Sequence, residues 1–247
     1  MNTPLVSLRH VNKTFSNGTV ALRDLNLDVG EHQFMSLLGP SGCGKSTALR
    51  LIAGLVGVSD GTIEWPGHAA DQKKNKDISF VFQEPTLMPW ATAWTNVYLP
   101  LKLEGVSKSN AKAAVDEALE NVGLTGFGGS YPRELSGGMK MRVSIARALV
   151  TKPKILLMDE PFAALDEITR NRLNDDLIEL WERENWTVIF VTHSVFESVY
   201  LSNRIVVMAA RPGRIIEDID IDISERTTGG ESYRISKAYT EQCRAVS

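Results

Sequence analysis

Nine residues from Gly39 to Thr47, GPSGCGKST, combine glycines, a lysine and hydroxyl side chains in the spacing G-x-x-x-x-G-K-[ST]. Glycines let the backbone curl so that successive N–H groups point into one concavity, and a helix that begins near Gly44 adds its positive N-terminal end. Lys45 would reach the β- and γ-phosphates of a nucleotide, and Ser46 would offer a hydroxyl to Mg²⁺. The stretch predicts a nucleoside triphosphate site built from Gly39, Pro40, Ser41, Gly42, Cys43, Gly44, Lys45, Ser46 and Thr47.

Two adjacent carboxylates could supply the chemistry of hydrolysis at such a site. In ILLMDEP, residues 155–161, four apolar residues lead directly into Asp159 and Glu160. This order places both acids at the end of a buried strand. Asp159 could hold Mg²⁺, and Glu160 could orient or deprotonate the attacking water.

A second glycine-rich stretch, LSGGM at residues 135–139, directly precedes the helical pattern KMRVSIARAL. Taken alone, Gly137 and Gly138 could be a hinge before a helix. The alternative is a second phosphate cradle at a helix start. One chain would then carry two such cradles, which a self-contained nucleotide site does not need.

Compact apolar runs predict the strands that position these groups. They occur at 34–38, 78–82, 155–158, 188–191 and 205–208, and such runs suit strands buried on both faces of a parallel sheet. Helical patterns lie between most of them, at 111–122, 143–149 and 173–181, and from Ser194, where Glu197 completes a capping box. The alternation predicts an α/β core.

Three other segments depart from this alternation. Segments 5–8 and 25–29 alternate with period two and are predicted strands. No strong strand run occurs between Gln83 and Pro153, so we expect an inserted helical lobe there. Near the C-terminus, Ile219, Ile221 and Ile223 alternate with acids, which favours a solvated edge strand over a cation site formed by Asp218, Asp220 and Asp222.

The composition excludes several classes of protein. The 27 basic and 30 acidic residues give a net charge of −3, which does not favour nucleic-acid binding. No apolar run approaches the roughly 18 residues of a membrane-spanning helix, and the first residues lack a secretory signal pattern. The two cysteines do not form a disulfide framework. We expect a cytoplasmic protein, with Cys43 either filling a small space or sensitive to oxidation.

From residue 4 to about residue 215 the chain resembles the ATP-binding subunit of an ABC transporter. The resemblance rests on the P-loop, VFQEP, LSGG, LLMDEP, ALD and VTHS, which occur in that order. It implies a P-loop NTPase core with a mostly parallel sheet, an N-terminal antiparallel β-subdomain and an inserted α-helical subdomain. We expect one domain over residues 1–215, with the helical subdomain at about 88–152, and a short C-terminal extension over 216–247.

The resemblance also assigns roles to individual residues. Ser136, Gly137 and Gly138 would contact the γ-phosphate of ATP held by the opposing subunit of a homodimer. Asp166 would lie in the loop that connects the two sites, and His193 would touch the γ-phosphate. Gln83 would sense Mg²⁺ and the attacking water. Phe15 stands where the family stacks an aromatic ring on adenine, although a core position for this ring is nearly as plausible.

Several features are similar to the nitrate, taurine and sulfonate importer branch. They are Met139 where Gln is commonest, LMPWATAWTNVYLPL, MDEPFAALDEITR and MAARPGRI. This branch implies an ATPase at the cytoplasmic face of the inner (cell) membrane, bound to transmembrane permease subunits that work with a periplasmic or extracellular solute-binding protein. The solute would be a small anion or a vitamin precursor. Trp90 and Trp94 could face the permease, or either could fill the helical core.

Two other functions remain as alternatives. A lipid-trafficking branch also uses LSGGM, so an ABC ATPase of lipid traffic or export would fit that motif. A soluble ABC ATPase that acts on nucleic acid or ribosomes fits less well, because such proteins tend to carry two cassettes, a coiled-coil insertion or a basic patch.

Overall fold

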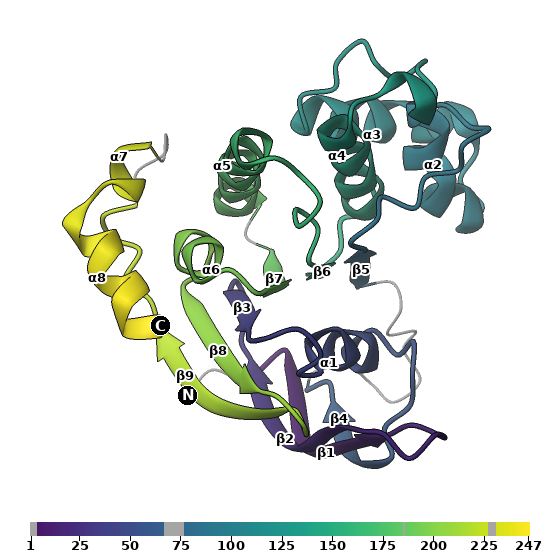
Figure 1. The fold of residues 1–247 in the computed structure, drawn as a ribbon. Helices are drawn as coiled ribbons and strands as arrows, with labels where there is room; N and C mark the ends of the chain where they lie inside the picture. Colours follow the sequence, from purple (N-terminus) through teal and green to yellow (C-terminus); the bar gives the residue numbers. More distant parts are fainter. Residues whose placement is uncertain (1–3, 67–76, 185, 227–230) are drawn as a thin grey trace.

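The computed structural model describes residues 4–66, 77–184, 186–226 and 231–247 (Figure 1). Its strands are β1 (Val6–Thr14), β2 (Val20–Val29), β3 (Phe34–Leu38), β4 (Asp60–Glu64), β5 (Ile78–Val81), β6 (Ile155–Asp159), β7 (Thr187–Thr192), β8 (Arg204–Ala209) and β9 (Arg214–Asp220). Its α-helices are α1 (Lys45–Ile52), α2 (Ala93–Leu103), α3 (Lys108–Asn121), α4 (Gly137–Leu149), α5 (Glu167–Glu184), α6 (Val195–Leu201), α7 (Glu231–Arg234) and α8 (Lys237–Val246).

A six-stranded sheet in the order β5-β6-β7-β3-β8-β9 forms the centre of the molecule. Neighbours from β5 to β8 run parallel, and β9 runs antiparallel to β8. Every residue of β3, β6 and β7 is buried, because helices or the second sheet cover both faces. The predicted α/β core with a mostly parallel sheet is therefore confirmed.

The edge strand predicted near the C-terminus is β9. Arg204 on the neighbouring strand donates to both carboxylate oxygens of Asp218, at 2.8 and 2.6 Å. Over the described residues, no group of three or more acidic, histidine or cysteine side chains is arranged to hold a metal ion. Asp218 and Asp220 thus belong to a solvated sheet edge, whereas Asp222 follows the strand and accepts from the N–H of Ser224 at 2.9 Å.

A smaller antiparallel sheet, in the order β2-β1-β4, packs against one face of the large sheet through α1. Their shared core contains Leu8 and Leu27 of the small sheet, Leu49 of α1 and Leu157 of β6. This is the antiparallel β-subdomain that the sequence predicts, and its period-two alternation buries one face only.

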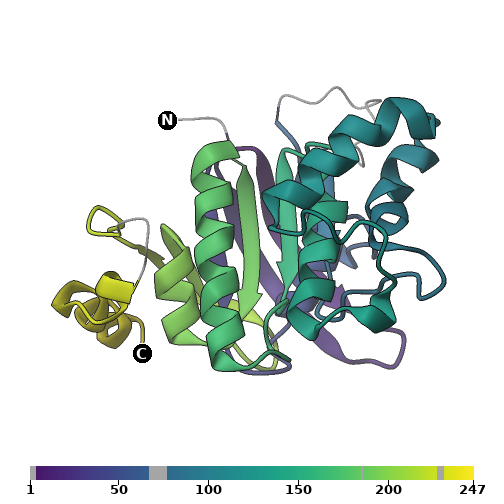
Figure 2. The ribbon, with the colours of Figure 1, turned by 90° about the horizontal axis from the view of Figure 1, so that it is seen from above.

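Helices α2, α3 and α4 lie between β5 and β6 in the chain and gather at one side of the molecule (Figures 1 and 2). Val97, Val115 and Val143, one from each helix, are fully buried in the same core cluster. The inserted helical subdomain is confirmed, while its bounds at 88 and 152 stay a prediction.

The C-terminal helices rest on α6. The Tyr239 hydroxyl of α8 donates to the Phe196 carbonyl at 2.8 Å, and the Arg234 guanidinium lies 3.8 Å from the centre of the Tyr200 ring. The boundary expected at residue 215 falls within β9, and the division of the chain there stays a prediction. None of the helices in the described segments is long and apolar enough to cross a membrane.

Candidate functional site

Four neighbouring parallel strands deliver the predicted site residues to one edge of the large sheet. The P-loop follows β3, Asp159 and Glu160 end or follow β6, His193 follows β7, and Gln83 comes two residues after β5. Because parallel strands end at the same edge, ligands of open α/β sheets bind outside these carboxyl ends. Ser46 and Asp159, which are 113 positions apart in the sequence, are thereby brought into contact.

The P-loop closes around the side chain of Lys45. Its Nζ donates to the carbonyls of Gly39 at 2.7 Å and Pro40 at 3.1 Å, and lies 3.9 Å from the Cys43 sulfur. Gly44 precedes α1 with φ 94°, and a Cβ there would lie 2.7 Å from Leu22 and 2.9 Å from the Ala21 carbonyl. Only glycine fits this conformation and this space. Packing against β2 therefore requires glycine at position 44, in addition to any requirement from phosphate binding.

The hydroxyl of Ser46 donates to Oδ1 of Asp159 at 2.6 Å. Burial raises the pKa of the Asp159 carboxyl, whereas the hydrogen bond from Ser46 and the charge of Arg50 act in the opposite direction. A hydroxyl beside a carboxylate, with room for phosphate oxygens, is the oxygen donor set that Mg²⁺ uses in nucleotide sites. These two residues therefore fit the metal that the sequence predicts.

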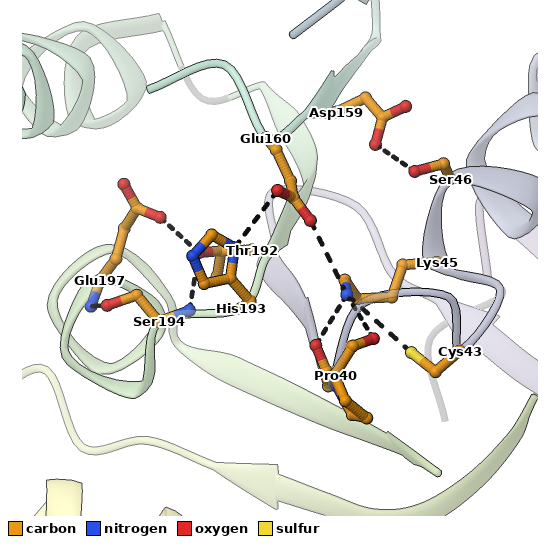
Figure 3. A network of polar contacts seen from close by, with 11 residues as sticks. Pro40, Cys43, Lys45, Ser46, Asp159, Glu160, Thr192, His193, Ser194 and Glu197 are labelled. Atoms are coloured by element: carbon orange, nitrogen blue, oxygen red, sulfur yellow. Dashed lines mark hydrogen bonds and ion pairs between the residues drawn. The ribbon is translucent and has the colours of Figure 1, made fainter. Parts of the chain in front are cut away.

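Glu160 links the P-loop to the histidine after β7 (Figure 3). One carboxylate oxygen lies 3.8 Å from Lys45 Nζ, and the other lies 3.2 Å from Nδ1 of His193. Glu160 has φ 47°, and its N–H donates to the Val191 carbonyl at 3.1 Å. A left-handed glutamate held by the next strand is a strained feature of the kind found at functional sites.

Behind His193, Glu197 accepts a short hydrogen bond from the Thr192 hydroxyl, and Thr192 in turn accepts from the N–H of Ser194 at 3.0 Å. Ser194 caps α6 as the sequence predicts, but the reciprocal half of the capping box does not form, because the Glu197 carboxylate bonds to Thr192 instead. Burial raises the pKa of Glu197. This carboxylate thus braces the turn that holds His193.

A cavity of about 600 Å³ opens over the P-loop. The predicted residues in its wall are Phe15, Ser41, Gly42, Gly44, Lys45, Ser46, Thr47, Gln83 and Glu160. Phe15 is 41% exposed, so its ring is available to a ligand and is not a core residue. Gly39, Pro40, Cys43 and Asp159 are not in the wall, but each contacts the side chain of Lys45 or Ser46, both of which are wall residues. Cys43 is fully buried, which agrees with its interpretation as a residue that fills a small space.

Four further wall residues were not among the predicted set: Thr19, Val20, Ala21 and Arg211. Thr19 directly precedes β2, and Val20 and Ala21 are its first residues; none of the three carries a side chain that indicated a chemical role. Arg211 lies in MAARPGRI, a segment whose similarity to the importer branch was noted but to which no role was assigned.

The LSGG stretch lies elsewhere. Ser136 caps α4 by accepting from the N–H of Met139 at 3.3 Å. Ser136 and Gly138 line a second cavity of about 690 Å³, whose wall shares no residue with the cavity over the P-loop. Asp166 is in neither wall; it caps α5 by accepting from the N–H of Thr169 at 2.9 Å. The chain does not bring its two cradles together.

Comparison with known proteins decides the family. A family model described as ABC transporter matches residues 22–163, which include the P-loop, LSGG and the Asp159-Glu160 pair. The chain belongs to the ABC transporter family. Members of this family are ATPases, and this chain is an ATP-binding ATPase of that kind.

Individual ABC proteins are similar over most of their length. An aliphatic sulfonates import ATP-binding protein of Bacillus licheniformis is 46% identical, covering 88% of this chain and 85% of that protein. A taurine import ATP-binding protein of Rhizobium johnstonii is 44% identical, with 90% and 85% covered. Among solved structures, a dimeric ATP-binding cassette in a post-hydrolysis state with ADP and phosphate has a TM-score of 0.76 at 34% identity, covering 88% of this chain and 99% of that one.

Replacement of Lys45 by alanine removes the cation that the P-loop encloses. A hydrogen bond to a charged group contributes roughly 1.5–3 kcal/mol, so ATP affinity should fall at least about 10-fold in Lys45→Ala, while the variant remains folded in a thermal unfolding measurement. Titration with a fluorescent ATP analogue measures this. Lys237→Ala, at a lysine side chain that is 89% exposed, should bind as the wild type does. Unchanged affinity in Lys45→Ala would show that the P-loop assignment is wrong.

Glu197 should make stability depend on pH. Its folded-state pKa is raised above the ordinary 4.5, so its stabilising contribution is complete below the unfolded-state pKa and is lost as the pH rises through the folded-state pKa. Glutamine stays neutral. The free energy of unfolding of the wild type should therefore decrease relative to Glu197→Gln as the pH rises above about 4.5, in urea titrations at several pH values. Exposed Glu104→Gln is the control, and a flat difference for Glu197→Gln would contradict the assignment.

Proposed function

We propose that the chain is the ATP-hydrolysing subunit of an ABC importer and works as a homodimer with two composite ATP sites. Each site would combine the P-loop of one chain with Ser136, Gly137 and Gly138 of the other. The observation that carries the proposal is the separation of the two cradles into cavities with no common wall residue. The similarity to a dimeric cassette solved with ADP and phosphate supports it.

Within each site, the residues around Glu160 provide the chemistry of hydrolysis. Glu160 would accept the proton of the attacking water, because its carboxylate stands at the cavity wall between Lys45 and His193. His193 would contact the γ-phosphate and orient Glu160 relative to it. Asp166 would lie in the loop that connects the two ATP sites. Phe15 would stack on the adenine ring.

Mg²⁺ is the metal that the donors fit. Ser46 and Asp159 would hold it, with Gln83 as a further oxygen ligand from the strand end beside β6. The metal would neutralise phosphate charge during transfer. The protein's own part is to fix two oxygen donors 2.6 Å apart next to the P-loop lysine.

The surface that would meet the permease is a groove of about 310 Å³ beside α2, lined by Met88, Trp90, Ala91, Thr92, Thr95, Leu99, Lys102 and Tyr131. Trp90 is 77% exposed. Trp94 instead donates from its indole N–H to Asp116 at 2.8 Å and packs against the helical core. The groove suits a short apolar helix, the helix-in-groove mode of recognition.

The side chains of Asn96 and Arg147 hold the segment that follows Gln83 against the groove and against α4. Buried Asn96 accepts from the N–H of Met88 at 2.7 Å and donates to the carbonyls of Ala91 and Thr92, so the groove wall is preformed. Arg147 of α4 donates to the carbonyls of Pro85 and Thr86, both at 2.9 Å. Movement of Gln83 toward a γ-phosphate would therefore reach both α4 and the groove.

The solute would be a small anion such as a sulfonate, taurine or nitrate, or a vitamin precursor. The named relatives are a sulfonate and a taurine importer subunit. Because the cavity over the P-loop is the proposed ATP site, we assign recognition of the solute to the permease and a solute-binding protein. The chain would lie at the cytoplasmic face of the cell membrane, held there by the permease.

Mixing two inactive variants tests the composite sites. Homodimers of Lys45→Ala and of Ser136→Arg should each be inactive. In the mixed dimer, one site carries both lesions and the other carries neither, so ATP hydrolysis should reappear on mixing. Sites formed within one chain would each keep one lesion and stay inactive.

Cooperativity between the sites could hide this recovery, so the ATP-bound state of Glu160→Gln is measured as well. This variant should accumulate as a dimer in light scattering, because it keeps the metal donors and loses the base. A Glu160→Gln protein that stays monomeric in ATP, together with no recovery on mixing, would refute the composite sites.

If the permease binds in the groove, a substitution there should impair transport without impairing ATP hydrolysis by the isolated subunit. Trp90→Glu places a charge on the exposed apolar wall, so ATP-driven transport in vesicles with the permease should fall at least about 10-fold while the isolated subunit hydrolyses ATP normally. Trp94→Ala should instead lower the thermal unfolding midpoint, since Trp94 packs in the core. Loss of folding in Trp90→Glu would contradict its assignment to a docking surface.

A further inference from the structure

The turn between β8 and β9, residues 210–213, is wedged between β2 and the P-loop. Gly213 donates to the Ala21 carbonyl at 3.0 Å and accepts from the N–H of Arg23 at 3.0 Å. A Cβ on Gly213 would lie 2.1 Å from the Cys43 carbonyl, a distance that no side chain tolerates. The turn is thus held at a fixed position against the nucleotide cavity.

This anchoring fixes Arg211, two residues earlier. Arg211 has φ 54° and is exposed, and it lines the cavity over the P-loop. No hydrogen bond or ion pair within the described segments engages its guanidinium. An arginine on the wall of an anion-binding cavity, on a rigid turn and without a protein partner, is placed to contact a ligand.

The neighbours of Arg211 show which part of the nucleotide it faces. Ser46, Gln83 and Glu160 line the cavity and are the residues proposed for Mg²⁺ binding and hydrolysis. Phe15, Val20 and Ala21 also line it; Phe15 is the residue proposed to stack on adenine, and Gly213 bonds the turn to Ala21. Arg211 therefore belongs to the end that holds the base and the α-phosphate, where ATP and ADP have the same structure.

We infer that Arg211 is a nucleotide-binding residue that supplies a positive charge to the base and α-phosphate end of the site, with equal effect on ATP and ADP. The inference rests on the ATP site described above. Lys13 already lies over the Phe15 ring, with its Nζ 5.3 Å from the ring centre, so Arg211 adds a second cation near the base. A guanidinium can stack on an aromatic face and bond a phosphate oxygen, and both contacts stabilise the bound nucleotide.

Arg211→Gln tests the inference in the full chain. The Kd values for ATP and ADP, measured by calorimetry, should rise by the same factor, about 10-fold (1.4 kcal/mol). The KM for ATP should rise in parallel, while kcat at saturating ATP stays within about twofold, because no contact is lost at the reacting phosphate. Arg211→Lys should recover part of the affinity, since it keeps the charge.

Arg214→Gln is the matched control. It removes an exposed arginine from the same hairpin that does not line the cavity, and it should bind both nucleotides like the wild type. Unchanged Kd values in Arg211→Gln would overturn the inference, as would a loss confined to ATP or an equal loss in Arg214→Gln. A wild-type protein that fails to bind ATP would instead refute the nucleotide site itself. Thermal unfolding midpoints of all variants confirm that they are folded.

Discussion

The parallel arrangement of β5, β6, β7 and β3 is the constraint on which the rest of the structure depends. It requires all four strands to end at one edge of the sheet, and each strand contributes one part of the site as it ends. The register is strongly fixed, because β3, β6 and β7 are buried on both faces and a slip would break the packing of helices on one side and the small sheet on the other. The packing of the core therefore fixes the positions of the site residues relative to one another.

Burial sets the electrostatics of this edge. It raises the pKa of both Asp159 and Glu197, which lie on either side of Glu160 in the cluster around the strand ends. Lys45 is the cation enclosed beside them, and its Nζ is shared between two loop carbonyls and Glu160. A metal ion bound between Ser46 and Asp159 would favour the ionised form of Asp159, so metal affinity and the protonation of this carboxyl are linked.

Sequence alone predicted the parts of the site that are local in the chain. A phosphate cradle is formed by consecutive backbone N–H groups, so GPSGCGKST contains nearly the whole of its geometry. The role of a single side chain depends on distant packing and was harder to predict. Trp90 and Trp94 are four residues apart in one segment. The indole of Trp94 is bonded to Asp116 of α3 and packs in the core, whereas that of Trp90 is exposed. Likewise, Glu197 was predicted only as a helix cap, since its bond to Thr192 depends on where β7 ends. The position of Arg211 depends on a contact between Gly213 and Ala21, which are far apart in the sequence.

The junction of β3 and the P-loop has a consequence for how the molecule moves. The residues of β3 are buried and bonded to a strand on each side, so their amide hydrogens exchange with solvent only when the whole domain opens. Ser41 and Gly42, a few residues later, are exposed. Strongly protected amides of β3 and the exposed backbone of the P-loop thus lie only a few peptide bonds apart, and the loop can open locally without opening the sheet. Ordering of this loop around a bound phosphate would therefore leave the hydrogen exchange of the β3 amides unchanged.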